Sequence, residues 1–259
     1  MTLFDMTGKT AVITGSTKGI GKAIAQRMAE HGANIVVSSR KEDVCEAVAA
    51  DINANWVQGD AKAIPMACNI QHKDHLQGLV DRALAEFGRI DVLVCNAAVD
   101  PYLGPSKDIP DEAFNRIMES NIRSNFWLSH MVLPGMVERN DGAIIIVSSI
   151  GGLRGSVGLA AYGISKAADM QIARNLAVEY GPHNIRVNAI APGLIKTDMA
   201  RALWEDDERR ARREATTPLR RLGEPDDIAG AAVLLATQAG AFITGQTIIV
   251  DGGVTIAPG

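Results

Sequence analysis

The sequence is poor in cysteine, poor in aromatic residues and without long apolar runs. Only 3 cysteines occur among 259 residues, Cys45, Cys68 and Cys95, and each lies in or near an apolar stretch. This pattern excludes a disulfide framework and predicts reduced core thiols in a cytoplasmic protein. No stretch is long and apolar enough to cross a membrane, and residues 1–9 lack the apolar core of a secretory signal. We therefore expect no membrane partner.

Positive charge is not in excess either. The chain has 26 Lys and Arg against 30 Asp and Glu, a formal net charge of -4. Because nucleic acids and anionic membranes bind basic surfaces, this balance argues against both as partners. Two histidines, His72 and His75, are three positions apart, but no cluster of carboxylates or thiols accompanies them. Without such ligands we expect no metal site.

Strand patterns alternate with helix patterns along the chain. Short apolar segments typical of buried strands occupy residues 10–14, 34–39, 63–68, 91–95, 142–149, 185–191 and 247–250. Helical segments of ten or more residues lie between them, for example residues 42–53, residues 72–87 and a long helix after residue 111 that reaches about Arg139. This order predicts an α/β fold, a Rossmann-type doubly wound parallel sheet with helices on both faces and the last strand at its edge. No linker or repeat interrupts the chain, so we expect a single domain over residues 1–259.

A glycine-rich turn follows the first predicted strand. It opens a helix that extends to about His31, and it reads Gly15, Ser16, Thr17, Lys18, Gly19, Ile20 and Gly21. In such a turn one glycine permits the tight bend, another lets a pyrophosphate approach the backbone, and a third lets the helix pack against the strand. The seven residues are therefore candidates for binding a dinucleotide. The alternative is a structural turn without a ligand.

The end of the second predicted strand indicates which dinucleotide is preferred. Folds that prefer NAD usually have an acidic residue there, which binds the ribose hydroxyls and repels a 2'-phosphate. Here that position is Ser39, followed by Arg40 and Lys41, and Lys18 adds a further positive charge. Cations in place of the acid favour NADP(H). NAD(H) stays possible, because Arg40 and Lys41 also suit the solvated start of a helix.

Two ionisable residues and a serine mark the predicted strand at 142–149 and the helix after it. Tyr162 and Lys166 are one helical turn apart, which puts the ammonium near the phenol. Because a nearby cation favours the phenolate, we expect a lowered pKa for Tyr162 and a role as general acid and base. Ser149, at the end of the strand, would hold a substrate oxygen. Alternatively, Tyr162 only packs and Lys166 is solvated.

With several further motifs, the chain resembles the short-chain dehydrogenase/reductase family over nearly its whole length. Each motif is modest alone, but the set is specific because its members occur in the family's order and in matching strand and helix contexts. The residues that carry the resemblance are Thr14, Gly15, Gly19, Ile20, Gly21, Asn96, Ala97, Ala98, Asn121, Ser149, Tyr162, Lys166, Pro192, Gly193 and Thr197.

The resemblance implies a catalytic tetrad of four residues. Tyr162 would be the general acid and base, Lys166 would lower its pKa and bind the nicotinamide ribose, and Ser149 would orient the substrate oxygen. Asn121 would position a water for proton supply. Ser148 is the rival of Ser149, and the family's usual spacing to the tyrosine favours Ser149. Further cofactor-binding positions implied by the resemblance are Asn69, Ile70, Asn96, Ala97, Ala98, Pro192, Gly193, Ile195 and Thr197.

Two positions depart from the family's pattern. The usual Asn-Asn-Ala-Gly is here Cys95, Asn96, Ala97 and Ala98, for which we expect altered packing and no loss of catalysis. The usual Asp at the end of the third strand is Asn69, which keeps a hydrogen-bonding amide and loses the charge.

Residues 194–222 resemble the family's substrate lid. They are helical in pattern and rich in arginine, but acidic residues lie beside the arginines, so a solvated helix is favoured over a site for an acidic acyl carrier. Such a lid would help to form an apolar pocket that suits a hydrophobic ketone or secondary alcohol. The candidate pocket residues are Tyr102, Leu103, Gly151, Leu153, Met199, Leu203 and Trp204.

The expected activity is that of an NADP(H)-dependent carbonyl reductase, an oxidoreductase that moves a hydride between the nicotinamide and a ketone, an aldehyde or a secondary alcohol. An NAD-dependent alcohol or hydroxysteroid dehydrogenase and a 3-oxoacyl-thioester reductase are the alternatives among enzymes. A nucleotide-binding redox sensor is a non-enzyme alternative, but such proteins often lose the tyrosine or the lysine. Relatives pair through the last strand, which implies a homotetramer or a homodimer.

Overall fold

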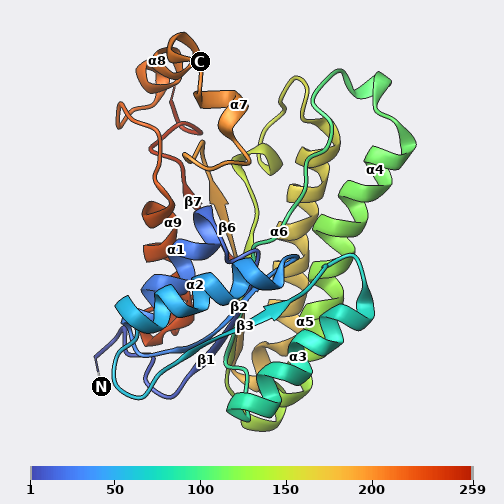
Figure 1. Ribbon diagram of the computed structural model, residues 1–259. Coiled ribbons are helices and arrows are strands. Elements are labelled where there is room, and N and C mark those ends of the chain that lie inside the picture. Colours follow the sequence, from blue (N-terminus) through green and yellow to red (C-terminus); the bar gives the residue numbers. More distant parts are fainter. Residues whose placement is uncertain (1, 258–259) are drawn as a thin grey trace.

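The computed structural model describes residues 2–257, which contain a sheet of seven parallel strands (Figure 1). In their order across the sheet, the strands are β3 (Ala63–Ala67), β2 (Asn34–Ser39), β1 (Thr10–Thr14), β4 (Val92–Cys95), β5 (Gly142–Val147), β6 (Ile185–Pro192) and β7 (Thr247–Val250). The chain proceeds outward from β1 in one direction and from β4 in the other. In open parallel sheets, ligands bind beyond the carboxyl ends of the strands at such a reversal of strand order.

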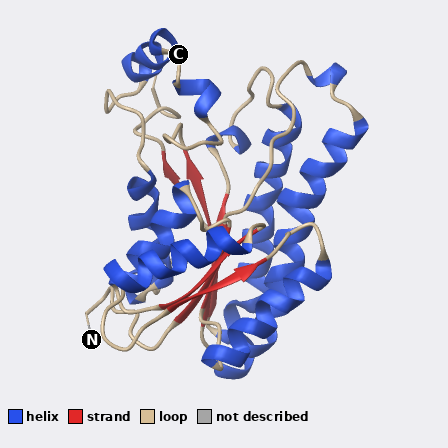
Figure 2. Ribbon diagram, in the orientation of Figure 1, coloured by secondary structure: helices blue, strands red, loops and turns tan. Residues whose placement is uncertain are grey.

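Helices cover both faces of the sheet (Figures 1 and 2). One face carries α1 (Gly19–Glu30), α2 (Glu42–Asn55) and α9 (Pro225–Ala236). The other face carries α3 (Lys73–Phe87), α5 (Ser124–Arg139) and α6 (Ala160–Tyr180), and α4 (Asp111–Met118) precedes α5. Two short helices, α7 (Arg201–Trp204) and α8 (Asp207–Thr216), lie beyond the carboxyl ends of β6 and β7 (Figure 1).

Two apolar cores form because side chains alternate along each strand. In β1, Ala11 and Ile13 face the core under α1, α2 and α9, whereas Val12 faces the core under α3, α5 and α6. All residues of β5 are buried. Burial on both faces is why these strands are continuous apolar runs in the sequence. The predicted doubly wound parallel sheet is confirmed, and β7 forms one edge as expected.

The structure differs from the prediction around the two segments that carry polar candidate residues. The helix expected to reach about Arg139 in one piece is interrupted by a π-helical turn, Glu119–Arg123, between α4 and α5. The strand expected over 142–149 ends at Val147, so Ser148 and Ser149 lie just beyond it.

Helix α9 is an element that the sequence analysis does not contain. Its start has a capping box between Glu224 and Asp227, with Pro225 at the first helical position. These are ordinary signals of a helix start, and the apolar residues after them are buried against the sheet. The sequence therefore holds enough local information to predict this helix.

The three cysteines are free and buried, as expected of core thiols. Burial raises the pKa of Cys68 and of Cys95 to about 12, which keeps both thiols protonated at neutral pH. Within residues 2–257, no helix is long and apolar enough to cross a membrane. The same residues contain no group of three His, Cys, Asp or Glu side chains that could hold a metal ion.

Candidate active site

The glycine turn between β1 and α1 is shaped by its glycines. Gly15 and Gly19 have positive φ angles of 65° and 53°, a conformation that other residues rarely adopt. A side chain at Gly21 would overlap the carbonyl oxygen of Gly15, so the helix can approach the turn only because Gly21 has none. No side chain caps the start of α1 at Lys18. The first amides of the helix therefore face the turn without a side-chain acceptor.

Asn96 ties the glycine turn to the end of β4. Its Nδ2 donates to the carbonyl oxygens of Thr14 and Gly15 at 2.9 and 3.1 Å. The backbone amides of Asn96 and Ala97 donate to Oγ1 of Thr14 at 3.0 and 3.1 Å. These four bonds fix the turn on the neighbouring strand, so Asn96 and Ala97 lie beside the turn. Ala98 follows them and is half-buried.

Arg40 and Lys41 follow β2 as expected, and the third predicted cation, Lys18 in the glycine turn, is paired. Arg40 and Lys41 are exposed and follow Ser39, whose backbone amide donates to Sγ of Cys45 at 3.2 Å. Lys18 forms an ion pair with Asp198 at 3.2 Å, which reduces the positive charge that it adds near Arg40. At the end of β3, the Asn69 side chain accepts a bond from the Gln71 amide at 3.3 Å. Ile70 packs against the apolar core.

The segment after β6 lies next to the glycine turn. A side chain at Gly19 would come within 3.1 Å of Cγ2 of Thr197, so the two loops are in close contact. The amide of Gly193 donates to the carbonyl of Val250 at 2.9 Å, and Ile195 forms a bridge with Gly223. Pro192 ends β6. The structure thus brings these predicted cofactor residues to the same end of the sheet as the glycine turn.

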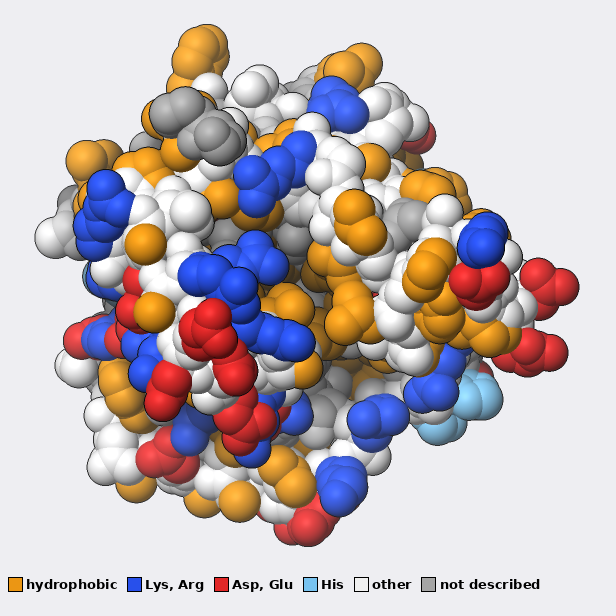
Figure 3. Space-filling view, turned by 90° about the horizontal axis from the view of Figure 1, so that it is seen from above, with side chains coloured by type: hydrophobic (Ala, Val, Ile, Leu, Met, Phe, Trp, Pro, Cys, Tyr) orange, Lys and Arg blue, Asp and Glu red, His pale blue; other side chains and the backbone are white. Residues whose placement is uncertain are grey.

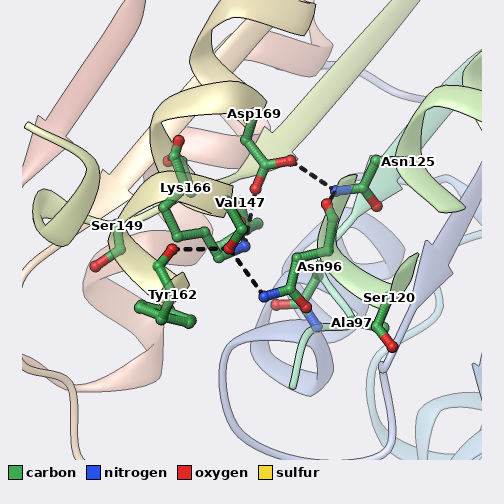
Figure 4. Close-up of polar contacts among 12 residues, drawn as sticks. Asn96, Ala97, Ser120, Asn125, Val147, Ser149, Tyr162, Lys166 and Asp169 are labelled. Carbon is green, nitrogen blue, oxygen red and sulfur yellow. Dashed lines mark hydrogen bonds and ion pairs between the residues drawn. The ribbon is translucent and has the colours of Figure 1, made fainter. Parts of the chain in front are cut away.

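Tyr162 and Lys166 lie on the same face of α6, as predicted. The Lys166 Nζ is 5.8 Å from the centre of the Tyr162 ring. It donates to the carbonyl oxygen of Val147 at 2.9 Å and pairs with Asp169 Oδ2 at 2.9 Å (Figure 4). The side chains of Lys166 and Asp169 are 2% and 0% exposed. The ammonium is therefore buried at the carboxyl end of β5, with an acidic partner that the sequence analysis does not mention.

The pKa of Tyr162 is displaced in the direction opposite to the prediction. Burial raises it, and the charge of Lys166 offsets only part of that effect, because Asp169 and Asp100 oppose Lys166. The expectation of a pKa below the ordinary value is therefore wrong for the protein without ligand. The phenol is neutral at neutral pH and can donate a proton.

The two serines after β5 differ in what their hydroxyls contact. Ser148 is buried, and its Oγ donates to the carbonyl oxygen of Lys166 at 2.7 Å. Ser149 is half-buried, and its Oγ accepts a bond from the Gly151 amide at 3.1 Å. Because the Ser148 hydroxyl is used by the helix backbone, Ser149 has the freer hydroxyl. This supports the preference for Ser149 over Ser148.

Asn121 lies in the π-helical turn and is fully buried. Its side chain accepts from the amide of Val99 at 2.9 Å and donates to the carbonyl of the same residue at 3.0 Å. A third bond joins its Nδ2 to Oγ of Ser165 on α6 at 3.1 Å. The side-chain amide thus joins the segment after β4 to α6. The π-helical turn itself is a feature that often occurs at functional sites.

The predicted substrate residues are only partly brought together. Tyr102 lines a small cavity beside Tyr162 and Gly158, and its hydroxyl donates to Pro105 O at 2.8 Å. Gly151 lies next to Ser149, and a side chain there would contact its hydroxyl. By contrast, Leu153 and Met199 are 44% and 58% exposed, and Leu103 is exposed as well. Leu203 and Trp204 are half-buried on α7, where Trp204 Nε1 donates to Thr197 O at 3.1 Å.

A larger cavity of about 290 Å³ lies between the ends of β6 and β7 and helix α8. Its lining includes Ile150, Gly193, Ile195 and Arg213. Seen from above, the molecule is hollowed at its centre, with apolar side chains on the wall of the hollow and charged side chains on one rim (Figure 3). On α8, Arg210 pairs with Asp207 at 2.6 Å.

Asp169 and its partner Asn125 were not among the site residues predicted from the sequence. Asp169 comes three residues after Lys166, a spacing that puts both side chains on one helical face. Asn125 comes four residues after Asn121 and is also buried. An acid on the apolar face of a helix, next to a candidate lysine, is a signal that could have been found, because unpaired buried acids are rare.

The comparisons with known proteins match nearly the whole chain. A family sequence model described as enoyl-(acyl carrier protein) reductase matches residues 15–255. The human dehydrogenase/reductase SDR family member 4 is 40% identical over 250 residues, 96% of this chain and 88% of that protein. A solved 7 alpha-hydroxysteroid dehydrogenase, complexed with NADH and 7-oxo glycochenodeoxycholic acid, is 37% identical, with a TM-score of 0.91 over 97% of this chain and 96% of that chain.

A second solved relative carries the other nicotinamide cofactor. The gluconate 5-dehydrogenase from Burkholderia cenocepacia J2315, in complex with NADP and tartrate, is 30% identical, with a TM-score of 0.93 over 99% of this chain and 98% of that chain. The similarity thus extends over sequence and fold together, and it supports a nicotinamide cofactor without separating NADP from NADH. On these grounds the chain belongs to the short-chain dehydrogenase/reductase family of oxidoreductases.

Proposed function

We propose that the protein is an NADP(H)-dependent oxidoreductase that interconverts a ketone or aldehyde and the corresponding alcohol, with Tyr162 as general acid and base. The observation that carries the proposal is the buried Lys166 ammonium, 5.8 Å from the centre of the Tyr162 ring and bonded to the last carbonyl of β5. A phenol beside a fixed cation at the ligand-binding end of a parallel sheet can exchange a proton with a substrate oxygen.

The residues at this end of the sheet fit a dinucleotide. The glycine turn leaves the first amides of α1 open to a pyrophosphate, and a side chain at Gly21 would disrupt it. When bound, the cofactor supplies or accepts the hydride. Asn69 would lie beside the adenine, Ile70 would lie next to it in the cofactor site, and the segment Asn96, Ala97 and Ala98 would follow the cofactor. The nicotinamide amide would lie near Pro192, Gly193, Ile195 and Thr197.

The protein's own residues would handle the proton. Tyr162, neutral at neutral pH because burial raises its pKa, donates to the carbonyl oxygen in reduction and accepts from the alcohol in oxidation. The half-buried hydroxyl of Ser149 orients that oxygen, since the Ser148 hydroxyl is bonded to the Lys166 carbonyl. Lys166 provides positive charge beside the phenol and a donor for the nicotinamide ribose. Asn121 holds the segment after β4 against α6 and would order a water for proton supply.

The preference for NADP(H) rests on charge at the end of β2. No acid follows Ser39 directly, and the exposed side chains of Arg40 and Lys41 can reach a 2'-phosphate. The next acid, Glu42, accepts a bond from the Ala67 amide at 2.8 Å. NAD(H) is the alternative, and the hydroxysteroid dehydrogenase relative solved with NADH favours an NAD-dependent hydroxysteroid or alcohol dehydrogenase as the second candidate.

Residues 194–222 would form a lid over the substrate. Helices α7 and α8 lie beyond the carboxyl ends of the strands, and α8 lines the larger cavity. Because the arginines of α8 have acidic neighbours on the same helix, a hydrophobic carbonyl substrate is preferred to an acyl carrier. Tyr102, Gly151, Leu153, Met199 and Trp204 would contact that substrate beneath the lid.

Removal of the Tyr162 hydroxyl tests the proposal. Tyr162→Phe should reduce kcat/KM for ketone reduction by about 10² to 10⁴, because general acid catalysis is lost. NADPH binding, followed by nicotinamide fluorescence, should persist. Tyr180→Phe, at the far end of α6, is the matched control and should keep the rate. Near-native turnover in Tyr162→Phe, over a panel of ketones, quinones, steroids and acyl thioesters, would refute the assigned role.

A further inference from the structure

The ion pair between Lys166 and Asp169 is not explained by the proton transfer described above. Both side chains lie inside the molecule, 2% and 0% exposed, and Asp169 is part of neither cavity lining. Removing two charges from water into such a place is unfavourable for folding, even when they pair. The pair is therefore a feature that the fold retains at a cost, directly beside the proposed proton donor.

Both oxygens of the Asp169 carboxylate are bonded. Oδ2 accepts from Lys166 Nζ at 2.9 Å, and Oδ1 accepts from Asn125 Nδ2 at 2.9 Å (Figure 4). Asn125 is itself buried, and its Nδ2 also donates to the carbonyl of Asn121 at 2.7 Å. The carboxylate is thus fixed from two helices, α5 and α6. Burial raises the pKa of Asp169, and the charge of Lys166 and the two donors oppose this effect by favouring the ionised carboxylate.

Lys166 has few other contacts that favour its charged form. Apart from Asp169, Nζ of Lys166 has one hydrogen-bond partner among residues 2–257, the neutral carbonyl oxygen of Val147. Burial alone lowers the pKa of a lysine, and here the negative charge of Asp169 raises the pKa of Lys166 above its ordinary value.

The other titratable groups that face this pair do not replace the carboxylate. Tyr162 faces Lys166 from the same helix as a neutral phenol, and Cys95 faces it from β4 as a thiol whose pKa burial raises to about 12. Asp100, in the segment after β4, acts on Tyr162 and carries a buried Oδ1 without a hydrogen-bond partner. Asp169 is the anion in direct contact with the ammonium.

We propose that Asp169 is a positioning residue that keeps Lys166 charged and holds its ammonium beside the Tyr162 ring, with Asn125 fixing the carboxylate. The proposal rests on the proposed function only in assigning a purpose to the charged lysine. The alternative is a purely structural ion pair, whose loss would destabilise the fold without changing the charge of Lys166.

The charge of Lys166 can be measured without substrate or cofactor. In protein labelled with ¹⁵N at lysine Nζ, the Lys166 signal is the one absent from Lys166→Met. In the natural protein it should stay protonated up to the alkaline limit of folding. In Asp169→Asn we expect the pKa of Lys166 to fall by at least about 2 pH units, because the carboxylate no longer opposes burial. Asp169→Glu keeps the charge and should restore the high value.

Activity gives a second and independent readout. In Asp169→Asn, kcat for ketone reduction should fall as pH rises through the lowered pKa of Lys166, at a lower pH than in the natural protein, and recover as pH decreases again, which no merely structural loss would produce. Asp226→Asn removes the partner of an exposed arginine, Arg27, and should leave the pH profile unchanged. An Asp169→Asn signal that titrates as in the natural protein overturns the proposal.

A neutral Lys166 at pH 7 in the natural protein also overturns the proposal, and this result is available even if Asp169→Asn does not fold. The titrations test the role of Asp169, and the turnover assay tests the oxidoreductase activity, so one proposal can be wrong without the other. If Lys166 loses its charge in Asp169→Asn while the natural protein reduces no carbonyl, the positioning role stands and the proposed oxidoreductase activity is wrong.

Discussion

At the scale of single residues, the phenol of Tyr162 is subject to opposing effects. Burial raises its pKa, the charge of Lys166 lowers it, and the acids Asp100 and Asp169 raise it again. Spacing in the sequence indicated the lysine, but neither the depth of burial nor the two acids. This is why the predicted direction was wrong, although the proximity of the two side chains was predicted correctly.

The raised pKa of Tyr162 predicts the pH dependence of both directions. Reduction needs the protonated phenol, so its rate should be constant through neutral pH and fall only as pH rises through the raised pKa. Oxidation needs the phenolate and should increase with pH over the same range. The profile of kcat/KM for a ketone measures this. An alkaline limb below about 9, under the ordinary tyrosine value of about 10, would mean that Lys166 outweighs burial after all.

Arg40 is the residue on which the cofactor preference depends most. Arg40→Asp removes a charged donor to the 2'-phosphate and adds repulsion, so affinity for NADPH should fall by about 10- to 100-fold, since a hydrogen bond to a charged group is worth about 1.5–3 kcal/mol. Affinity for NADH should stay similar or improve. Titration of the protein with both cofactors measures the change.

The control for this substitution is Arg82→Asp, which makes the same change on the exposed face of α3. Its ratio of NADPH to NADH affinity should equal that of the natural protein. If Arg40→Asp leaves the ratio unchanged as well, or if the natural protein prefers NADH, the charge argument at the end of β2 is wrong. Lys18 illustrates why the sequence overstates this charge, because its partner Asp198 is 180 positions away.

At the scale of elements, the strands were predictable because each carries its own signal. Apolar runs identified all seven, and β1, β2 and β7 match residue for residue. The π-helical turn around Asn121 was not predictable, because it depends on the bonds of Asn121 to Val99 and Ser165 in other elements. The same holds for Asp169, whose burial is decided by the packing of α5 against α6.

The junction of β1 and α1 permits a sharp test at Gly21. In Gly21→Ala the new methyl would overlap the carbonyl of Gly15 and come within 2.5 Å of Asn96 Nδ2, the group that fixes the turn. We expect a loss of about 1–3 kcal/mol in stability and a large loss of NADPH binding. Denaturant unfolding and a cofactor titration measure the two effects.

Gly230→Ala is the matched control in α9, where a methyl meets no atom within 4 Å. Since alanine favours a helix over glycine, this variant should gain about 0.5–1 kcal/mol of stability and bind cofactor normally. Cofactor binding by Gly21→Ala at the natural affinity would show that the turn does not carry the pyrophosphate site.

At the scale of the whole molecule, the edge of the sheet formed by β7 is open. β7 pairs with β6 on one side, and among residues 2–257 no strand pairs with its other side. Ile249 on this strand is 45% exposed, and Phe242, just before it, is fully exposed. Exposed sheet edges with apolar side chains are normally covered, and a second copy of the chain across a two-fold axis is the simplest cover.

Substitution of Ile249 tests whether copies of the chain assemble through this edge. We expect the natural protein to form a tetramer or dimer, and Ile249→Asp to lower its mass in light scattering, because two copies of the new carboxylate would face each other across the axis. The melting temperature of Ile249→Asp should then be lower and less dependent on protein concentration. Leu84→Asp, on the exposed face of α3, is the control and should keep the assembly. The prediction is contradicted if the natural protein is monomeric or if Ile249→Asp has an unchanged mass. The apolar side chains of β7 would then need an explanation other than a second copy of the chain.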